Sequence, residues 1–355
     1  MLISGANAIA VENIKKIDIP ETDLWNLVIS PDGTRLAYVT YDEMRNQQIF
    51  VLNTDGSEEK KLTDDANKKW GLSWGEEQIA YVSYGNGGLE KIFVINPDGT
   101  GNAQLIPGNN RQGNFERYML VWGAPSWSND GSLLTYTSLD EKANQKIYYV
   151  NSKGTNPKLV RNDNFKQWSP SFSHDAKSIV YVSYPETKYK EELFIVDIAG
   201  TERKQLTFDE IKKNYPVWGP DGTILFVSYE SVTSSNEKLF AIDQDGKNRR
   251  LFINADHKQR YPSFSSDGKK FAYAAIDISG NIKIAVGDVT GITDAQEVAP
   301  VSTAPVPDGK TPVSTLTVQE TAEEKKKPMP SVSIVPVISV ILLLALLMKK
   351  NIFKK

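Results

Sequence analysis

The chain has 355 residues, of which 40% are hydrophobic and 24% are charged, and its formal net charge at pH 7 is −3. This is the composition of a globular protein without the excess of positive charge that polyanion binding requires, so nucleic acid is not expected as a partner. The absence of cysteine excludes disulfides, thiolate metal ligands and cysteine nucleophiles.

The N-terminal segment, residues 1–12, contains the small-x-small pattern Ala6-Asn7-Ala8. This pattern is like that of a signal-peptidase site, but the segment has neither a basic start nor a full apolar stretch. We interpret residues 1–12 either as the remnant of a signal peptide or as a frayed terminus.

A repeat with a period of about 45 residues fills residues 13–299, and such a period is typical of propellers and solenoids. Each repeat is marked by a turn such as Ser30-Pro31-Asp32-Gly33, in which proline presets φ and glycine accepts a positive φ. The six turns begin at Ser30, Trp74, Ser128, Ser173, Gly219 and Ser265.

Two short runs of β-branched, aromatic and aliphatic residues follow each turn and predict two strands. The first runs are 36–39, 79–82, 133–136, 179–182, 224–227 and 271–274, and the second runs are 49–52, 92–95, 147–150, 193–196, 239–242 and 282–285. We expect a hairpin turn after each second run, ending at Gly56, Gly99, Gly154, Gly200, Gly246 and Gly291. The flanking segments raise the count to four antiparallel strands per repeat, so the sequence predicts an all-β fold, a six-bladed β-propeller.

The N-terminal segment also predicts how the ring closes. Lys15-Lys16-Ile17 precedes Trp25 at the same spacing at which Lys60-Lys61-Leu62 precedes Trp70, so it is expected to be the outer strand of the sixth blade. The segment 295–298 is the alternative for that place. Closure removes exposed sheet edges, and we therefore expect the propeller to be monomeric.

The C-terminal part predicts a membrane anchor. Residues 300–330 are rich in Pro, Thr, Ser and Glu without periodic apolar spacing, which predicts a disordered linker. Residues 331–349 are almost wholly apolar and long enough for one transmembrane helix. The basic tail, 350–355, places this end in the cytoplasm and the propeller outside the cell, in a single-pass cell-membrane protein.

Several motifs resemble those of a known family. Leu62-Thr63, Leu206-Thr207 and Tyr215-Pro216-Val217-Trp218-Gly219-Pro220-Asp221-Gly222 are similar to the WD-like repeats of TolB-type propellers, over about residues 15–298. The resemblance implies the fold and says little about function. TolB proteins have an additional N-terminal domain that is not recognisable here, so a role in a Tol-type complex is not expected. The linker, apolar segment and lysines instead resemble the tails of propeller-bearing surface proteins of archaea.

Catalytic motifs are scarce. The sequence has no Gly-x-Ser-x-Gly nucleophile elbow, and its only histidines, His174 and His257, are expected to be solvated. Asp243-Gln244-Asp245-Gly246 resembles the start of a calcium loop but lacks the later glutamate, so it is interpreted as a turn. We expect no catalysis, no cofactor and no metal.

The candidate ligand-binding residues lie in the loops that lead into the innermost strands, because propellers gather these loops on one face around the channel. They are the cations and aromatics Trp25, Lys69, Trp70, Arg111, Arg117, Tyr118, Lys166, Trp168, Lys213, Tyr215, Arg260 and Tyr261. The hypothesis is that they bind a protein or an acidic glycan or peptide, the cations by attraction and the aromatics by stacking. The alternative is that the aromatics pack between blades and the lysines are solvated and partly neutralised by Asp64, Asp65, Asp163, Asp209, Glu210 and Asp256.

Three functions follow. The favoured one is an extracytoplasmic binding or protein-interaction module at the cell surface. The others are a structural envelope component and a propeller lyase or hydrolase with a metal bound in its channel.

Overall fold

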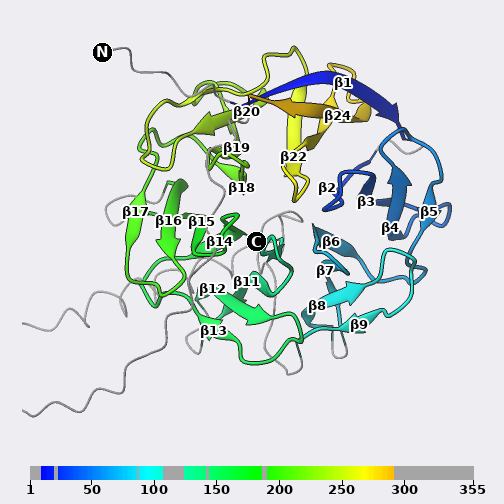
Figure 1. Cartoon of the computed structure of the whole chain (residues 1–355), viewed down its shortest axis with the longest axis horizontal. Coiled ribbons are helices and arrows are strands. Elements are labelled where there is room, and N and C mark those ends of the chain that lie inside the picture. Colours follow the sequence, from blue (N-terminus) through cyan, green and yellow to red (C-terminus); the bar gives the residue numbers. More distant parts are fainter. Residues whose placement is uncertain are drawn as a thin grey trace, which may run out of the picture. The chain divides into compact units, whose positions relative to one another are not determined.

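In a computed structural model, the described part of the chain comprises residues 9–19, 23–85, 88–106, 124–140, 144–185 and 190–291. Six sheets of four antiparallel strands surround a central axis (Figure 1). The predicted all-β fold of six four-stranded blades is therefore confirmed. The linker, the transmembrane helix and the basic tail lie outside these ranges, and within them no helix has the length and apolarity that crossing a membrane demands.

Blades one to five follow one another along the chain, each from its innermost to its outermost strand. The first blade consists of β2 (Asn26–Ile29), β3 (Arg35–Tyr41), β4 (Gln47–Asn53) and β5 (Lys60–Lys61), and the second of β6 (Lys69–Trp74), β7 (Ile79–Tyr84), β8 (Glu90–Ile95) and β9 (Ala103–Gln104). The third consists of β10 (Ser126–Trp127), β11 (Leu133–Leu139), β12 (Gln145–Asn151) and β13 (Lys158–Leu159), and the fourth of β14 (Gln167–Phe172), β15 (Ser178–Ser183), β16 (Glu192–Asp197) and β17 (Arg203–Gln205). The fifth consists of β18 (Asn214–Trp218), β19 (Ile224–Tyr229), β20 (Glu237–Ile242) and β21 (Arg250–Leu251). Every predicted pair of strand runs lies within the two middle strands of a blade.

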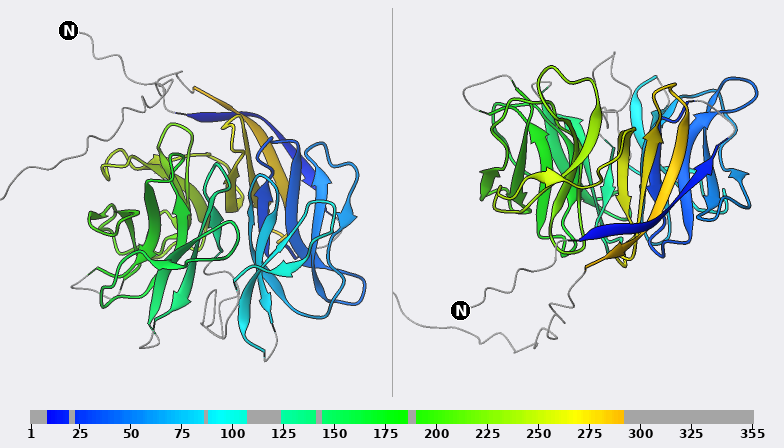
Figure 2. Two further views of the ribbon diagram at one scale, coloured as in Figure 1. Left: turned by 60° about the horizontal axis from the view of Figure 1, so that its bottom comes forward. Right: turned by 90° about the horizontal axis from the view of Figure 1, so that it is seen from above.

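The sixth blade combines both ends of the repeat region. It consists of β22 (Lys258–Phe264), β23 (Lys270–Ile276) and β24 (Ile282–Thr290), with β1 (Ala10–Asp18) as its outer strand. β1 pairs with β24 from Ala10 opposite Thr290 to Asp18 opposite Lys283, and it runs along the outer side of β24 in Figure 2. The predicted closure by the N-terminal strand is confirmed. The hairpin expected at Gly291 is wrong, because β1 takes the place of a following strand; the alternative strand, 295–298, lies outside the described residues.

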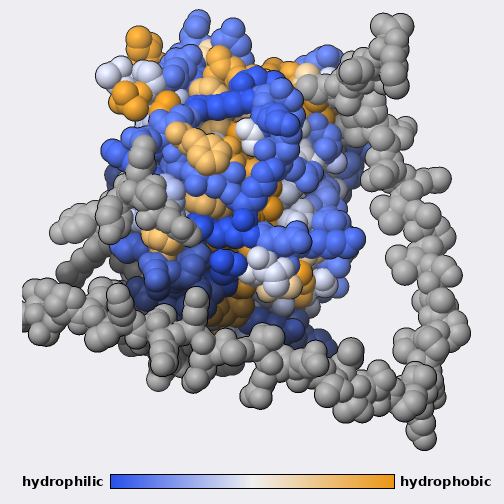
Figure 3. All heavy atoms as spheres, turned by 90° about the vertical axis from the view of Figure 1, so that its left-hand side faces the viewer, coloured by the Kyte–Doolittle hydropathy of each residue, from blue (hydrophilic) through white to orange (hydrophobic). Residues whose placement is uncertain are grey.

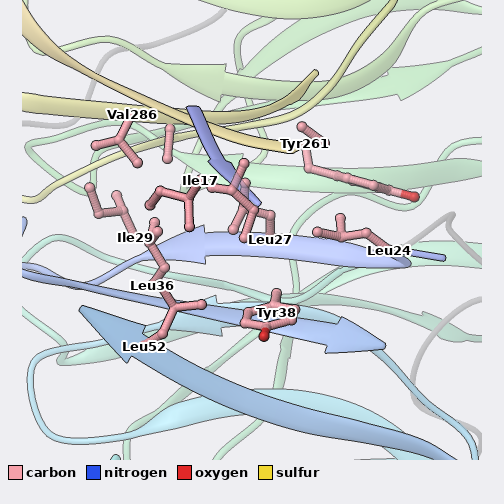
Figure 4. Packing of buried hydrophobic residues seen from close by; sticks show 12 residues of the cluster. Ile17, Leu24, Leu27, Ile29, Leu36, Tyr38, Leu52, Tyr261 and Val286 are labelled. Carbon is pink, nitrogen blue, oxygen red and sulfur yellow. The ribbon is translucent and has the colours of Figure 1, made fainter. Parts of the chain in front are cut away.

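The core repeats from blade to blade. In five blades an aromatic residue of the second strand stacks on its cross-strand neighbour in the third, with ring centroids 5.6 to 5.9 Å apart, as in Tyr38 on Phe50. Between the sixth and first blades, Ile17 and Val286 pack against Leu27 and Ile29 (Figure 4). Ile17 therefore anchors the closing strand in a core that also contains the innermost strand of the first blade. The outside of the ring is mostly hydrophilic on the side seen in Figure 3.

Buried lysines hold the loops that join one blade to the next. Lys69 begins β6 with a fully buried side chain, and its ammonium group donates to the Asn67 carbonyl at 2.7 Å and to the Asp65 carboxylate at 3.0 Å. Lys213 is equally buried and pairs with Glu192 of the preceding blade at 2.6 Å and with Asp209. We call these residues, together with Lys146 and Lys238, the junction lysines.

At two other junctions the lysine comes from the third strand of the preceding blade. Lys146 of β12 donates to the Phe165 carbonyl at 2.8 Å, and Lys238 of β20 donates to the His257 carbonyl at 3.2 Å. At these two junctions the residue at the start of the next inner strand is a glutamine, Gln167 or Gln259, at the position equivalent to Lys69 and Lys213. One buried ammonium group thus serves each of these four junctions, from either side.

A backbone amide of the third strand at each of these four junctions donates to a polar side chain, and the type of that side chain depends on which strand supplies the lysine. Where the lysine lies on the inner strand, a threonine hydroxyl accepts the strand amide at 3.0 Å, from Ile49 to Thr63 and from Leu193 to Thr207. In the other arrangement a glutamine oxygen accepts it, from Ile147 to Gln167 at 3.1 Å and from Leu239 to Gln259 at 2.8 Å. Both arrangements satisfy the same buried amide, which would otherwise cost about 1 to 3 kcal/mol.

Replacing Lys213 with methionine should lower the free energy of unfolding by about 3 to 5 kcal/mol, because Glu192 would remain buried without its cation. Urea unfolding followed by tryptophan fluorescence measures the change. The control is Lys247→Met, since the Lys247 pair with Asp245 is exposed and should leave the midpoint unchanged. Equal midpoints for Lys213→Met and the wild type would contradict the role given to the junction lysines.

Candidate functional site

The six innermost strands surround a central cavity of about 180 Å³. Hydrogen bonds join neighbouring strands around it: the Leu72 amide donates to Asn26 Oδ1 at 2.9 Å, the Trp127 amide to Ser73 Oγ at 3.0 Å, and the Ile29 amide to Ser263 Oγ at 3.1 Å. Since the side chains come from one blade and the amides from the next, these bonds fix the spacing of the blades. The channel wall is therefore a rigid scaffold.

Turns of three blades meet at one mouth of the channel. Asn129, in the turn of the third blade, donates from Nδ2 to the Ser266 carbonyl of the sixth blade at 3.2 Å. The Ser266 amide in turn donates to the Pro31 carbonyl of the first blade at 2.9 Å. Because the third and sixth blades face each other across the ring, these contacts span this mouth. The opposite mouth, where the inner strands begin, is where the predicted site residues lie.

His174 belongs to the cavity wall. Burial lowers the pKa of this histidine, although the negative charges of Asp221 and Asp175 act to raise it. Its Nε2 has no hydrogen-bond partner among the residues that the structure describes. His257 lies with its Nε2 3.2 Å from the Tyr273 hydroxyl, and burial lowers its pKa as well. His174 Nε2 is buried and His257 is half-buried beside Tyr273, so the expectation that both histidines are solvated holds only in part.

Backbone strain marks the inner strands where they enter the channel. Ser169, Tyr215 and Tyr261 have positive φ angles of 49°, 49° and 55°, and Gly71 takes the same place in the second blade at 64°. At each of these points the register with the neighbouring strand shifts. A left-handed non-glycine residue costs about 1 to 2 kcal/mol. Strain of this kind is kept only where surrounding structure enforces it, and it is common at functional sites.

The predicted aromatic residues fall into two groups. Tyr215 and Tyr261 line the cavity, with their rings edge to face at 5.0 Å. Trp25, Trp70 and Trp168 are not among the lining residues. Each packs edge to face on a tyrosine at or just after the end of the second strand of its own blade, at 6.2, 5.4 and 5.2 Å, the partners being Tyr41, Tyr84 and Tyr184. For these tryptophans the structure favours the packing alternative.

The predicted cations are also divided. Lys69 and Lys213 are buried in ion pairs and stabilise their loops, whereas Lys166 is exposed. Arg260 is partly exposed and pairs with Glu237. Arg111, Arg117 and Tyr118 lie outside the described residues. A role in ligand binding stays a prediction for the whole set.

The structure reveals three surface lysines that the sequence prediction missed, Lys68, Lys212 and Lys258, at equivalent positions to the predicted Lys166. Four equivalent loops each place an exposed or partly exposed lysine at the mouth where the inner strands begin. We call these four residues the lysine ring: Lys68, Lys166, Lys212 and Lys258. Three of their carbonyls accept a hydroxyl of the second strand, from Ser83 at 2.9 Å, Ser183 at 2.9 Å and Ser228 at 2.8 Å. The prediction chose Lys69 and Lys213 from the pairs Lys68-Lys69 and Lys212-Lys213, and in each pair the other lysine is the exposed one. Adjacent residues of an extended chain point to opposite sides, so only one lysine of such a pair can face outward.

Similarity to known proteins appears at the level of the fold. A scan against protein-family models and a sequence search of curated proteins find no match. Among solved structures, the chain is similar to TolB from Acinetobacter baumannii, with a TM-score of 0.55 and 19% identity over 74% of this chain and 67% of that one. It is also similar to oligogalacturonate lyase from Vibrio parahaemolyticus, with a TM-score of 0.51 and 12% identity over 79% of this chain and 98% of that one. The propeller domain of the Trilobed protease from Pyrococcus furiosus, described as having an open velcro topology, gives a TM-score of 0.51 and 16% identity over 74% of this chain and 81% of that one.

The two histidines predict how stability depends on pH. Burial lowers both folded-state pKa values below the ordinary 6.5, so the unfolded chain binds protons more readily in mild acid. Stability should therefore fall as the pH drops below 6.5 and should level off below the folded-state pKa values. Denaturant unfolding at pH 7.5, 6.5 and 5.5 measures this trend. A His174→Asn/His257→Gln variant should lose most of it, and an equal fall in the variant would refute the assignment.

Proposed function

We propose that this chain is a single-pass membrane protein whose monomeric propeller acts as a binding module outside the cell and recognises an acidic ligand. The observation that carries the proposal is the lysine ring, in which equivalent loops bring Lys68, Lys166, Lys212 and Lys258 to one mouth of the channel. Cations held at fixed positions around a rigid wall attract anions without an ordering cost in the protein backbone. TolB from Acinetobacter baumannii supports the proposal only through its shared fold.

The membrane placement rests on the sequence. The apolar residues 331–349 have the length of a transmembrane helix, and the lysines of 350–355 favour a cytoplasmic C-terminus. The linker, 300–330, would hold the propeller away from the bilayer. This arrangement is similar to that of propeller-bearing surface proteins of archaea, and we propose the same placement here.

A second candidate function is a lyase, which one observation favours: the fold shared with oligogalacturonate lyase from Vibrio parahaemolyticus. A metal-dependent version would need convergent ligands. Within the described ranges no three His, Asp or Glu side chains form a group that could hold a metal ion. We therefore place binding first, with a purely structural envelope role as the remaining alternative.

Charge reversal of the lysine ring tests the binding function. A variant with all four ring lysines changed to glutamate should lose at least about 90% of saturable binding to isolated acidic cell-surface polymers, because attraction becomes repulsion. The matched control reverses four exposed lysines in turns at the other ends of the strands, Lys153, Lys177, Lys247 and Lys269. Loss of binding in both variants, or in neither, would contradict a site at the ring, and failure of the wild type to bind any polymer would contradict the binding function itself.

Removal of residues 331–355 tests the anchor. The truncated chain should move from the membrane fraction to the soluble fraction, and protease added to intact cells should degrade the propeller of the full-length chain. A Lys→Gln change at the four tail lysines, Lys349, Lys350, Lys354 and Lys355, should reduce the fraction of molecules in that orientation. Membrane retention of the truncated chain, or full protection of the propeller, would refute the topology.

A further inference from the structure

The face that carries the lysine ring also has a groove. It has a volume of about 530 Å³, within the range of small-ligand sites, and is lined by loops of the fourth and fifth blades and by the start of the sixth. Its wall includes Ser231, Val232, Ser234 and Ser235 of the loop between β19 and β20, a loop longer than the equivalent 42–46 and 277–281. Extended loops on a rigid scaffold are where binding specificity is usually found.

The charge of the groove is positive. Four cations line it, against two carboxylates, namely Lys190, Lys212, Lys258 and Arg260 against Glu210 and Glu237. Glu237 is already committed, since it pairs with Arg260 Nε and lies 3.4 Å from the Tyr229 hydroxyl. Only 9% of the Glu237 side chain is exposed, compared with 37% for Arg260. A ligand in the groove therefore meets an excess of cations.

The Glu237 contact also orients the guanidinium group. Arg260 donates from Nε to Glu237 and also forms a side-chain hydrogen bond with Tyr261, and the rest of its five N–H donors remain for a carboxylate. On the channel side, Arg260 is followed by Tyr261. Burial raises the pKa of the Tyr261 hydroxyl to about 12, and the charge of Arg260 acts to lower it. Arg260 thus stands between the groove and the tyrosine pair of the channel mouth.

Buried charges hold one of the loops that line the groove. Lys213 pairs with Glu192, and the other oxygen of Glu192 accepts the Glu210 amide at 2.8 Å. This arrangement keeps Glu210 at a left-handed φ of 60°, an uncommon conformation for a non-glycine residue. The loop that carries Lys212 is consequently fixed before any ligand arrives, which lowers the entropy cost of binding.

The lining favours a carbohydrate over a peptide. Hydroxyl groups from Ser231, Ser234 and Ser235 and the half-buried ring of Tyr229 border the groove, and its aliphatic lining is limited to Ile211 and Val232. A peptide that binds by strand addition needs a free sheet edge, and neither β17 nor β21 contributes to the lining. A helical peptide needs a row of apolar contacts.

We propose that this groove is the ligand site of the module and that it binds a carboxylated oligosaccharide. A uronate carboxylate pairs with the Arg260 guanidinium group, Lys190 and Lys258 neutralise neighbouring carboxylates, and a sugar face packs on Tyr229. The proposal rests on the binding function proposed above and gives it a location and a class of ligand.

Calorimetric titration of the full-length chain in detergent micelles with tetragalacturonate tests the proposal. Saturable binding that weakens as salt is raised is expected, and cellotetraose, which is neutral, should not bind. Lys190→Ala/Lys258→Ala should weaken binding at least about tenfold, since each lost charge-assisted contact is worth about that factor. The control, Lys153→Ala/Lys247→Ala, removes the same charge from exposed lysines at the opposite ends of the strands and should bind as the wild type does.

Equal affinity of the Lys190→Ala/Lys258→Ala variant and the wild type would overturn the groove as the site. Tetraglutamate binding as tightly as tetragalacturonate would overturn the preference for a carbohydrate. If tetragalacturonate fails to bind while other surface polymers still bind in a manner that needs the lysine ring, only this proposal falls. If no polymer binds, the binding function falls with it.

Discussion

A buried ammonium group between neighbouring blades is the interaction on which much of this ring depends. The loop that leaves one blade leads inward to the next, and some of its carbonyls accept from a buried lysine ammonium group. Lys69 and Lys146 donate to such carbonyls directly, and Lys213 adds a buried pair with Glu192. Because charged groups are costly to bury alone, loss of one partner from a buried pair such as Lys213 and Glu192 should be strongly destabilising.

Ring closure adds a second constraint. β1 completes the blade that the last three strands begin, so separation of the first and sixth blades requires loss of the β1 and β24 pairing and of the Ile17 contacts. Side chains such as Asn26 and Ser73 then tie the inner strands to one another. A wall built in this way moves little, and the loops at its mouth are correspondingly well placed for recognition.

The same loops contribute to stability and carry the proposed site. In the pair Lys212-Lys213 the second lysine is buried against Glu192, and the first lines the groove that also contains Arg260. The buried residue fixes the position of its neighbour, so a change that unfolds the loop would also disperse the surface charge. The conformation of the loops that carry the proposed site is therefore set from within the blades.

The sequence by itself determined the number of blades, the two middle strands of each and the closing strand, because these follow from local turn chemistry and a repeat that is visible without coordinates. Tertiary structure decided which charged and aromatic side chains reach the surface. Trp70 and Lys69 look like binding residues in the sequence, yet Trp70 packs on Tyr84, and Lys69 is buried and pairs with Asp65. The groove around Arg260 was also beyond prediction, since Lys190, Glu237 and Lys258 lie far apart in the chain and meet only when the blades are packed into a ring.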